Sequence, residues 1–199
     1  MKRREALKFV GLMGLLGSIP SLAGCSWKSV YTAIREYVPV GLQAFVGILG
    51  VLSGGGIISL GANAAIDAVI ALVNKAFGDV TTAVAQLQAT PPVGTVATIS
   101  AVLNTLSANI AKFMSDINVP DGQLAALVSG LANVILSTLA GFQTQLPNQP
   151  VATTVSAPHS FRIAGQTVTV FAKKRSLSQF KHEYNALAMQ YGHAEIALK

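Results

Sequence analysis

The stretch ANAAIDAVIALVNKAFGDVTTAVAQLQ, residues 62–88, decides the fold of this chain. Its apolar residues recur in alternating steps of four and three, at Ala62, Ile66, Val69, Val73, Ala76, Val80, Ala83 and Leu87. Polar and charged residues fall beside this stripe on the opposite face, at Asp67, Asn74, Lys75, Thr81 and Gln88. The spacing is close to a heptad repeat, so it predicts a long amphipathic helix that crosses its neighbours at a shallow angle.

Stripes of the same kind predict three further helices, one before this stretch and two after it. Their apolar residues are Tyr31, Ile34, Val38, Leu42, Phe45, Leu49 and Leu52, then Val96, Ile99, Leu103, Leu106, Ile110, Phe113 and Ile117, then Leu124, Leu127, Leu131, Ile135, Leu139, Phe142 and Leu146. We expect a kink at Pro39 in the first of them. Short turns at residues 91–94 and 119–122 make sequential helices antiparallel. The sequence therefore predicts a mainly α protein, with an antiparallel up-and-down four-helix bundle over residues 25–146.

The low charge of the first half allows a second interpretation. No charged residue lies between Glu36 and Asp67, and residues 38–73 are apolar enough to predict a helical hairpin that enters a membrane. Gly50 and Gly54 also have the GxxxG spacing of closely packed membrane helices. A proline, several glycines and scattered polar residues favour instead a buried helix pair inside the bundle; the polar residues are Gln43, Ser53, Ser59 and Asn63.

The pattern changes after residue 146. Residues 147–160 are rich in Pro, Thr and Ser and are typical of an extended linker. Residues 161–199 predict a small basic ββα module, with a turn at 164–166, a strand at 167–171, a helix ended by Gly192 and a short third strand at 194–198. We expect this module to dock on the bundle or on a partner, because it is too small to be stable alone. We also expect the aromatic residues Phe171, Phe180, Tyr184 and Tyr191 to form the core of this module; the last three belong to the apolar stripe of its helix, with Leu177 and Leu187.

One cluster in this module has the chemistry to contact a partner. Lys173, Lys174 and Arg175, followed by Lys181, are four cations that can meet phosphates, lipid headgroups or anionic cell-wall polymers. A solvated strand-to-helix junction explains the same residues without a partner.

The sequence contains no catalytic motif. The histidines, His159, His182 and His193, match no compact metal-binding spacing, and His182-Glu183 lacks a second histidine four residues later. Asp67 lies beside the apolar stripe, where a solvent-facing carboxylate is expected. We therefore expect no catalytic residue, no metal ligand and no cofactor. An envelope hydrolase or metal-dependent enzyme stays as a distant alternative.

The first 25 residues predict the destination of the chain. A basic segment leads into an apolar one, which ends at Leu22-Ala23-Gly24-Cys25. This end resembles the lipobox of bacterial lipoproteins, and the resemblance implies that residues 1–24 are cleaved and that Cys25 carries a lipid. Arg3 and Arg4 resemble part of a twin-arginine export signal, although any secretory signal is basic and the general export route fits them too.

Cleavage also changes the charge of the protein. It removes four basic residues and one acidic residue, so the net charge falls from +6 to +3. This modest charge argues against nucleic acid as a partner. The sequence thus predicts a non-catalytic, lipid-anchored envelope protein with a structural or protein-interaction role, facing the periplasm or the exterior from the inner or outer membrane. We expect an envelope protein or an anionic polymer as its partner, and an oligomer is compatible with the sequence.

Overall fold

The computed structural model describes residues 27–61, 63–85, 93–146 and 160–199. The predicted signal peptide, the lipobox and the twin-arginine pair lie outside these residues, as does the predicted linker except for its last residue. The elements are α1 (Trp27–Gly54), α2 (Ala64–Ala85), α3 (Val93–Asp116), α4 (Gly122–Gln143), β1 (Ser160–Ile163), β2 (Gln166–Thr169), α5 (Leu177–Gln190) and a single 3₁₀ turn, η1 (Ala194–Ile196).

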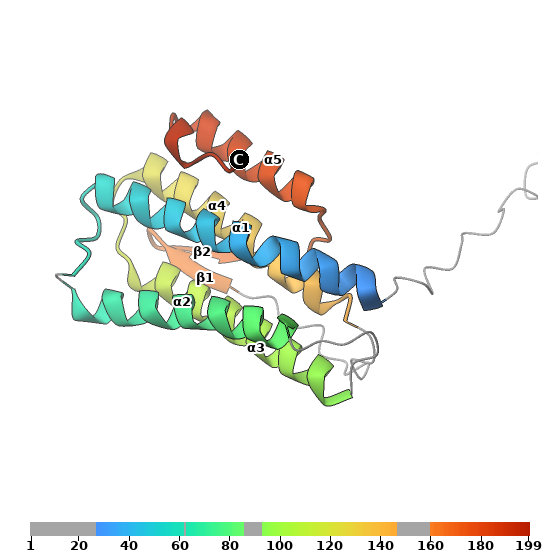
Figure 1. Cartoon of the computed structure of the whole chain (residues 1–199). Coiled ribbons are helices and arrows are strands. Elements are labelled where there is room, and N and C mark those ends of the chain that lie inside the picture. The colour runs from blue at the N-terminus through green and yellow to red at the C-terminus, as the bar shows by residue number, and fades with distance from the viewer. Residues whose placement is uncertain (1–26, 62, 86–92, 147–159) are drawn as a thin grey trace, which may run out of the picture.

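The protein is mainly α, and its four long helices pack in sequence. α1 contacts α2, α2 contacts α3, α3 contacts α4, and α4 returns to α1. Successive helices alternate in direction in Figure 1, so the predicted up-and-down bundle is confirmed. A β-hairpin and a C-terminal helix follow the bundle, as the sequence predicted.

The apolar stripes lie where the heptad spacing places them. All seven core residues predicted for the third stripe are buried, six of them in α3 and Ile117 directly after it. In α2 the buried residues include Val69, Val73, Ala76, Val80 and Ala83. The two ends of the predicted α2 stripe, Ala62 and Leu87, lie outside the described residues.

Local side-chain chemistry fixes where the helices begin. The Asn63 side chain accepts hydrogen bonds from the first amides of α2, at Ala65 N (3.2 Å) and Ile66 N (3.3 Å). The Asp67 carboxylate, in the first turn of α2, is half-buried and accepts from Gly61 N (3.1 Å), so it holds the chain before the helix, a role that the sequence did not predict. α3 starts at Val93, so residues 93 and 94 are helical and not part of a turn.

α4 is the central helix of the molecule. It contacts α1, α3 and α5, and an unbroken run of its residues, Val134 to Phe142, is buried. In Figure 1, α5 lies on one side of α1 and α4, while α2 and α3 lie on the other. The C-terminal helix thus covers the bundle and does not stand apart from it.

The β-hairpin is shorter than predicted. β1 and β2 pair antiparallel, with Ile163 opposite Gln166, so that only Ala164 and Gly165 form the turn. Both turn residues have positive φ (49° and 77°), as a tight two-residue hairpin turn requires. β1 packs on α3, and its Arg162 N donates to Ser115 Oγ (3.1 Å). The predicted third strand at 194–198 is wrong, because Ala194–Ile196 forms the η1 turn.

The aromatic stripe of α5 packs on the bundle, so the prediction that it forms a separate core is wrong. The Phe180 ring stacks edge-on against Tyr37 of α1, with ring centroids 4.9 Å apart. The Tyr184 hydroxyl donates to the Ala44 carbonyl of α1 (2.8 Å). The Tyr37 hydroxyl in turn donates to the Ile135 carbonyl of α4 (3.4 Å). Burial raises the pKa of both Tyr37 and Tyr184 above the ordinary tyrosine value, so both hydroxyls stay protonated as donors.

Candidate functional site

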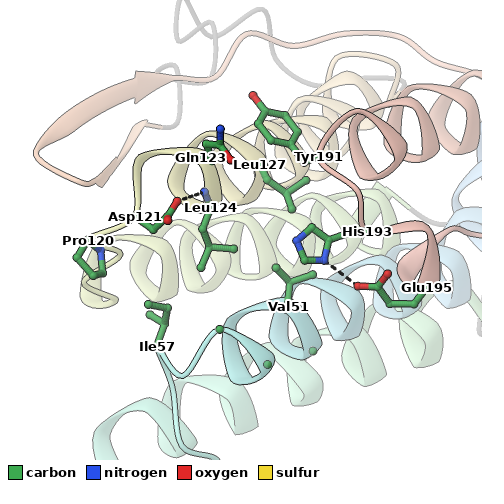
Figure 2. A pocket seen from close by; sticks show the side chains of 13 residues that line it. Val51, Ile57, Pro120, Asp121, Gln123, Leu124, Leu127, Tyr191, His193 and Glu195 are labelled. Carbon is green, nitrogen blue, oxygen red and sulfur yellow. Dashed lines mark hydrogen bonds and ion pairs between the residues drawn. The ribbon is translucent and has the colours of Figure 1, made fainter.

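A cleft of about 630 Å³ opens where the end of α1, the start of α4 and the C-terminal segment meet. We call it the His193 cleft, and Figure 2 shows the side chains that line it. Its walls carry Val51, Leu124 and Leu127 from the bundle, together with Tyr191 and His193 from the C-terminal segment. A cleft of this size and mixed lining is typical of a site for a small ligand or a peptide side chain.

Glycines of α1 keep one wall of the His193 cleft open. A Cβ atom added at Gly50 or Gly54 would meet no atom within 4 Å. These two residues gave the GxxxG spacing, and the structure places both of them on the cleft.

A helix stop holds His193 in the wall of the cleft. Gly192 adopts φ +79° directly after α5, and His193 N donates to the Ala188 carbonyl (2.8 Å). Gly192 N donates to the Met189 carbonyl (3.1 Å), which completes a Schellman motif. The sequence predicted this helix stop from Gly192, but it did not predict that His193, the next residue, lines a cleft.

The side chains of His193 and Glu195, which both line the cleft, contact each other. His193 Nδ1 lies 2.7 Å from Glu195 Oε1, and the two side chains are 33% and 65% exposed. The hydrogen bond from His193 lowers the pKa of Glu195 below its ordinary value. A proton held on Nδ1 leaves Nε2 of the neutral ring as a hydrogen-bond acceptor.

The other carboxylate of the cleft has a structural role. Asp121 Oδ1 accepts a hydrogen bond from Leu124 N (2.8 Å) and so caps the N-terminus of α4. Figure 2 shows Asp121 and His193 on different walls, with Leu124 between them.

The described lining of the His193 cleft combines apolar side chains with polar groups that can bond to a ligand, among them Asp121, Tyr191, His193 and Glu195. It contains an imidazole oriented by a carboxylate, but no Ser, Thr, Cys or Lys side chain is among these lining residues. Across residues 27–61, 63–85, 93–146 and 160–199, no group of three or more His, Cys, Asp or Glu side chains is placed to hold a metal ion. The enzyme alternative has no further support from the described residues.

The predicted basic cluster is tied into the protein. The Arg175 side chain is only 5% exposed, and its Nε and Nη2 atoms lie 2.9 and 2.8 Å from Glu183 Oε2. Its Nη1 donates to two hydroxyls of α4, Ser137 Oγ (2.7 Å) and Thr138 Oγ1 (3.2 Å). The hydrogen bond from Arg175 is the main cause of the lowered pKa of Glu183. Arg175 therefore fastens the lead-in of α5 to α4.

The three lysines of the cluster differ from Arg175 in exposure. Lys173 Nζ lies 2.8 Å from Glu183 Oε1, yet its side chain is 57% exposed. Lys181 Nζ donates to the backbone oxygen of Lys199, and Lys174 is exposed and has a partner of its own. Contact of this cluster with an anionic partner stays a prediction. It now rests on the three lysines, because Arg175 is buried.

Comparison with known proteins finds no relative. No protein-family model, curated protein or solved structure matches this chain.

Proposed function

We propose that this protein is a lipid-anchored component of the cell envelope, with a structural or protein-interaction role and no catalytic one. Cys25 carries the lipid, and residues 1–24 are the signal peptide. The support for the anchor is the lipobox Leu22-Ala23-Gly24-Cys25 after a basic and apolar leader.

The observation that carries this proposal is that apolar helix surface is packed inside the bundle. Three helices are long and apolar enough to cross a membrane by length and composition, at Ser29–Gly54, Ala64–Ala85 and Gly122–Gln143. The most apolar of them belongs to α4, where 72% of the window is buried within the protein. The apolar surface of α4 packs on α1, α3 and α5, whereas 50% of the α1 window and 39% of the α2 window are buried. It is the burial of α4 that favours attachment through a lipid over insertion.

The anchor and the bundle are close in the chain. α1 begins at Trp27, two residues after Cys25, so the bundle starts at the point of attachment. Each methylene of an acyl chain that is buried in the membrane stabilises the attachment by about 0.8 kcal/mol, so two or more chains make it lasting. The end of α1 and the His193 cleft then lie a full helix away from the lipid.

The test separates the lipid from the leader. Replacing Leu22, Gly24 and Cys25 by alanine leaves small residues for cleavage but removes the lipidated thiol. The parent chain should partition with membranes and incorporate labelled palmitate, whereas the triple variant should lose both properties. Mass spectrometry of the variant checks that the leader has been removed. Ser26→Ala is the matched control and should behave as the parent chain.

A second candidate is a membrane-inserted protein with residues 38–73 in the bilayer. The three apolar helices favour it, since each is long enough to span. It predicts that the cleaved triple variant stays in the membrane fraction until detergent is added. That result would replace the first proposal with the second.

A further inference from the structure

A second hollow, of about 630 Å³, lies between the N-terminal half of α1 and the C-terminal half of α2. Its walls are mostly apolar, with Val38, Leu42, Phe77 and Val84, and α2 also contributes the polar side chains of Asn74 and Thr81. We call it the Arg35 groove, because Arg35 lines it beside these apolar side chains. It shares no lining residue with the His193 cleft.

Arg35 is the one charged residue in the described lining of this groove, and no carboxylate lines it. The lysines of α2 and α3 differ, because each pairs with an aspartate four residues later, Lys75 with Asp79 (2.7 Å) and Lys112 with Asp116 (2.7 Å). The residue four after Arg35 is Pro39, which offers no carboxylate. Among the described residues, Arg35 has neither an ion pair nor a side-chain hydrogen bond.

Two residues that line the groove, Gly78 and Pro39, have no long side chain to fill it. Gly78 lines it from α2, and a Cβ atom there would meet nothing within 4 Å. Pro39 lines it from α1 and has no amide hydrogen, so the Arg35 carbonyl lacks its usual partner within the helix. The groove is therefore open, mostly apolar along its walls and provided with one cation.

We propose that the Arg35 groove binds a long-chain carboxylate, with the acyl chain along the apolar walls and the carboxylate on the Arg35 guanidinium. Its volume lies within the range of small-ligand sites. A planar guanidinium pairs with a carboxylate through two parallel hydrogen bonds, which a neutral head group cannot reproduce. Charge complementarity thus selects an anionic amphiphile over a neutral one. The inference does not depend on the lipid anchor, since both the site and the ligand are separate from Cys25.

The acyl chain on Cys25 is the competing occupant. Cys25 lies ten residues before Arg35 in the sequence, which is close enough for its lipid to reach the groove. Such a chain has no carboxylate, so it leaves Arg35 without a partner. The two occupants therefore differ in how strongly binding depends on Arg35.

The experiment measures binding of oleate and of oleyl alcohol to the whole unlipidated chain, made as the cleaved triple variant, by titration calorimetry. We expect one saturable oleate site and weaker binding of the alcohol. Arg35→Gln should weaken oleate binding about fivefold and leave the alcohol unchanged. Gly78→Leu should abolish both, because its side chain fills the groove.

Matched variants separate the groove from general effects. Arg162→Gln removes an exposed arginine from β1, and Gly50→Leu fills the His193 cleft at a glycine with the same open space; both should bind oleate as the parent does. Circular dichroism checks that each variant is folded. The proposal is overturned if the parent shows no saturable oleate site, or if Gly50→Leu and Gly78→Leu have equal effects. Oleate binding that is indifferent to Arg35→Gln also overturns it and points to the acyl chain of Cys25.

Discussion

The interface between α2 and α3 and the interface of α5 with α1 and α4 are built on different chemistry. α2 and α3 meet mainly through continuous apolar stripes, and their ion pairs, Lys75–Asp79 and Lys112–Asp116, stay within one helix each. A side-chain hydrogen bond between the two helices, from Asn109 to the Leu72 carbonyl (3.3 Å), is exposed. The interface of α5 and the segment before it combines aromatic packing with polar contacts: the Tyr184 hydroxyl on Ala44, the Arg175 guanidinium on α4 and the Lys173 amide on the Ser137 carbonyl.

The difference lies in how much each contact depends on one partner residue. An apolar stripe tolerates many arrangements of similar volume, because burial of apolar surface has no direction. A hydrogen bond from Tyr184 needs one carbonyl at one position, 140 residues earlier in the chain. α2 and α3 are therefore specified by a pattern, and the position of α5 is specified by individual contacts.

The largest effect is expected from a charge in the apolar stripe. Val80 in α2 is 1% exposed, so Val80→Asp buries a carboxylate without a partner. We expect a loss of more than about 4 kcal/mol, or no folding at all, measured by urea denaturation. Thr82→Asp, on the exposed face of the same helix, should cost less than about 1 kcal/mol. If the two variants lose similar free energies of unfolding, burial of the apolar stripe does not determine how α2 packs.

A methyl group on α4 should disturb the α5 interface at a single point. A Cβ atom at Gly141 would lie 2.3 Å from the Lys173 carbonyl oxygen, which belongs to the backbone and cannot rotate away. Gly141→Ala should cost about 2–3 kcal/mol. It should also speed hydrogen exchange in α5 more than in α2. Gly78→Ala, where a Cβ meets nothing within 4 Å, should instead stabilise the protein by up to about 1 kcal/mol.

Removing the buried arginine should weaken the same interface by a smaller amount. Arg175→Ala takes away the partner of Glu183 and of two α4 hydroxyls, and we expect a loss of about 2 kcal/mol. This value is below that of a fully buried pair, because Glu183 is 31% exposed. Lys173→Ala should cost less than about 1 kcal/mol, since that lysine is 57% exposed. Equal losses in denaturation would contradict a structural role specific to Arg175.

A single hydroxyl group sharpens the comparison further. Tyr184→Phe removes the donor to the Ala44 carbonyl and keeps the ring, so it should cost about 1 kcal/mol. Tyr191→Phe is the matched change on a half-buried ring and should alter stability by less than about 0.5 kcal/mol. If Tyr184→Phe is as stable as the parent, packing alone positions α5.

The smallest effect is expected from pH. Glu183 has a lowered pKa because it accepts from Arg175, so its charged form stabilises the folded state above the ordinary glutamate pKa. This stabilisation is lost as the pH falls through the lowered pKa. Melting temperatures of the parent and of Glu183→Gln should therefore differ at pH 7 and converge in acid. A constant difference down to low pH would remove the ion pair as its cause.

Much of the fold was predictable because its signals are local. The third stripe along the chain named seven residues and all seven are buried, since one apolar face per helix suffices to specify burial. The stop of α5 at Gly192 was predictable in the same way, because it acts on neighbouring backbone groups, and in the structure the start of α5 is capped by Ser176, whose side chain accepts from Gln179 N. The hairpin boundaries and the 3₁₀ turn at 194–196 were missed, because short segments have too few residues to show a period.

The candidate site was less predictable. The sequence singled out Arg175 for its charge, but the side chain is used internally because Ser137, Thr138 and Glu183 surround it. From the sequence, His193 was considered only as a metal ligand and Arg35 was not singled out, because each is alone in its local sequence. The residues around His193 and Arg35 belong to other helices, so the spacing of residues along the chain cannot predict them.

By itself, the sequence determined the four long helices, their buried faces, the hairpin and the capped C-terminal helix. Each of these follows from interactions between residues a few positions apart, where the repeat of the backbone sets which side chains share a face. Only the tertiary structure decided that α5 covers α1 and α4, that Arg175 is buried, and that one hollow opens beside each half of α1. These features depend on contacts between residues that are 37 to 140 positions apart in the sequence. One example is the hydrogen bond from the Tyr184 hydroxyl to the Ala44 carbonyl, for which Gly47 leaves room.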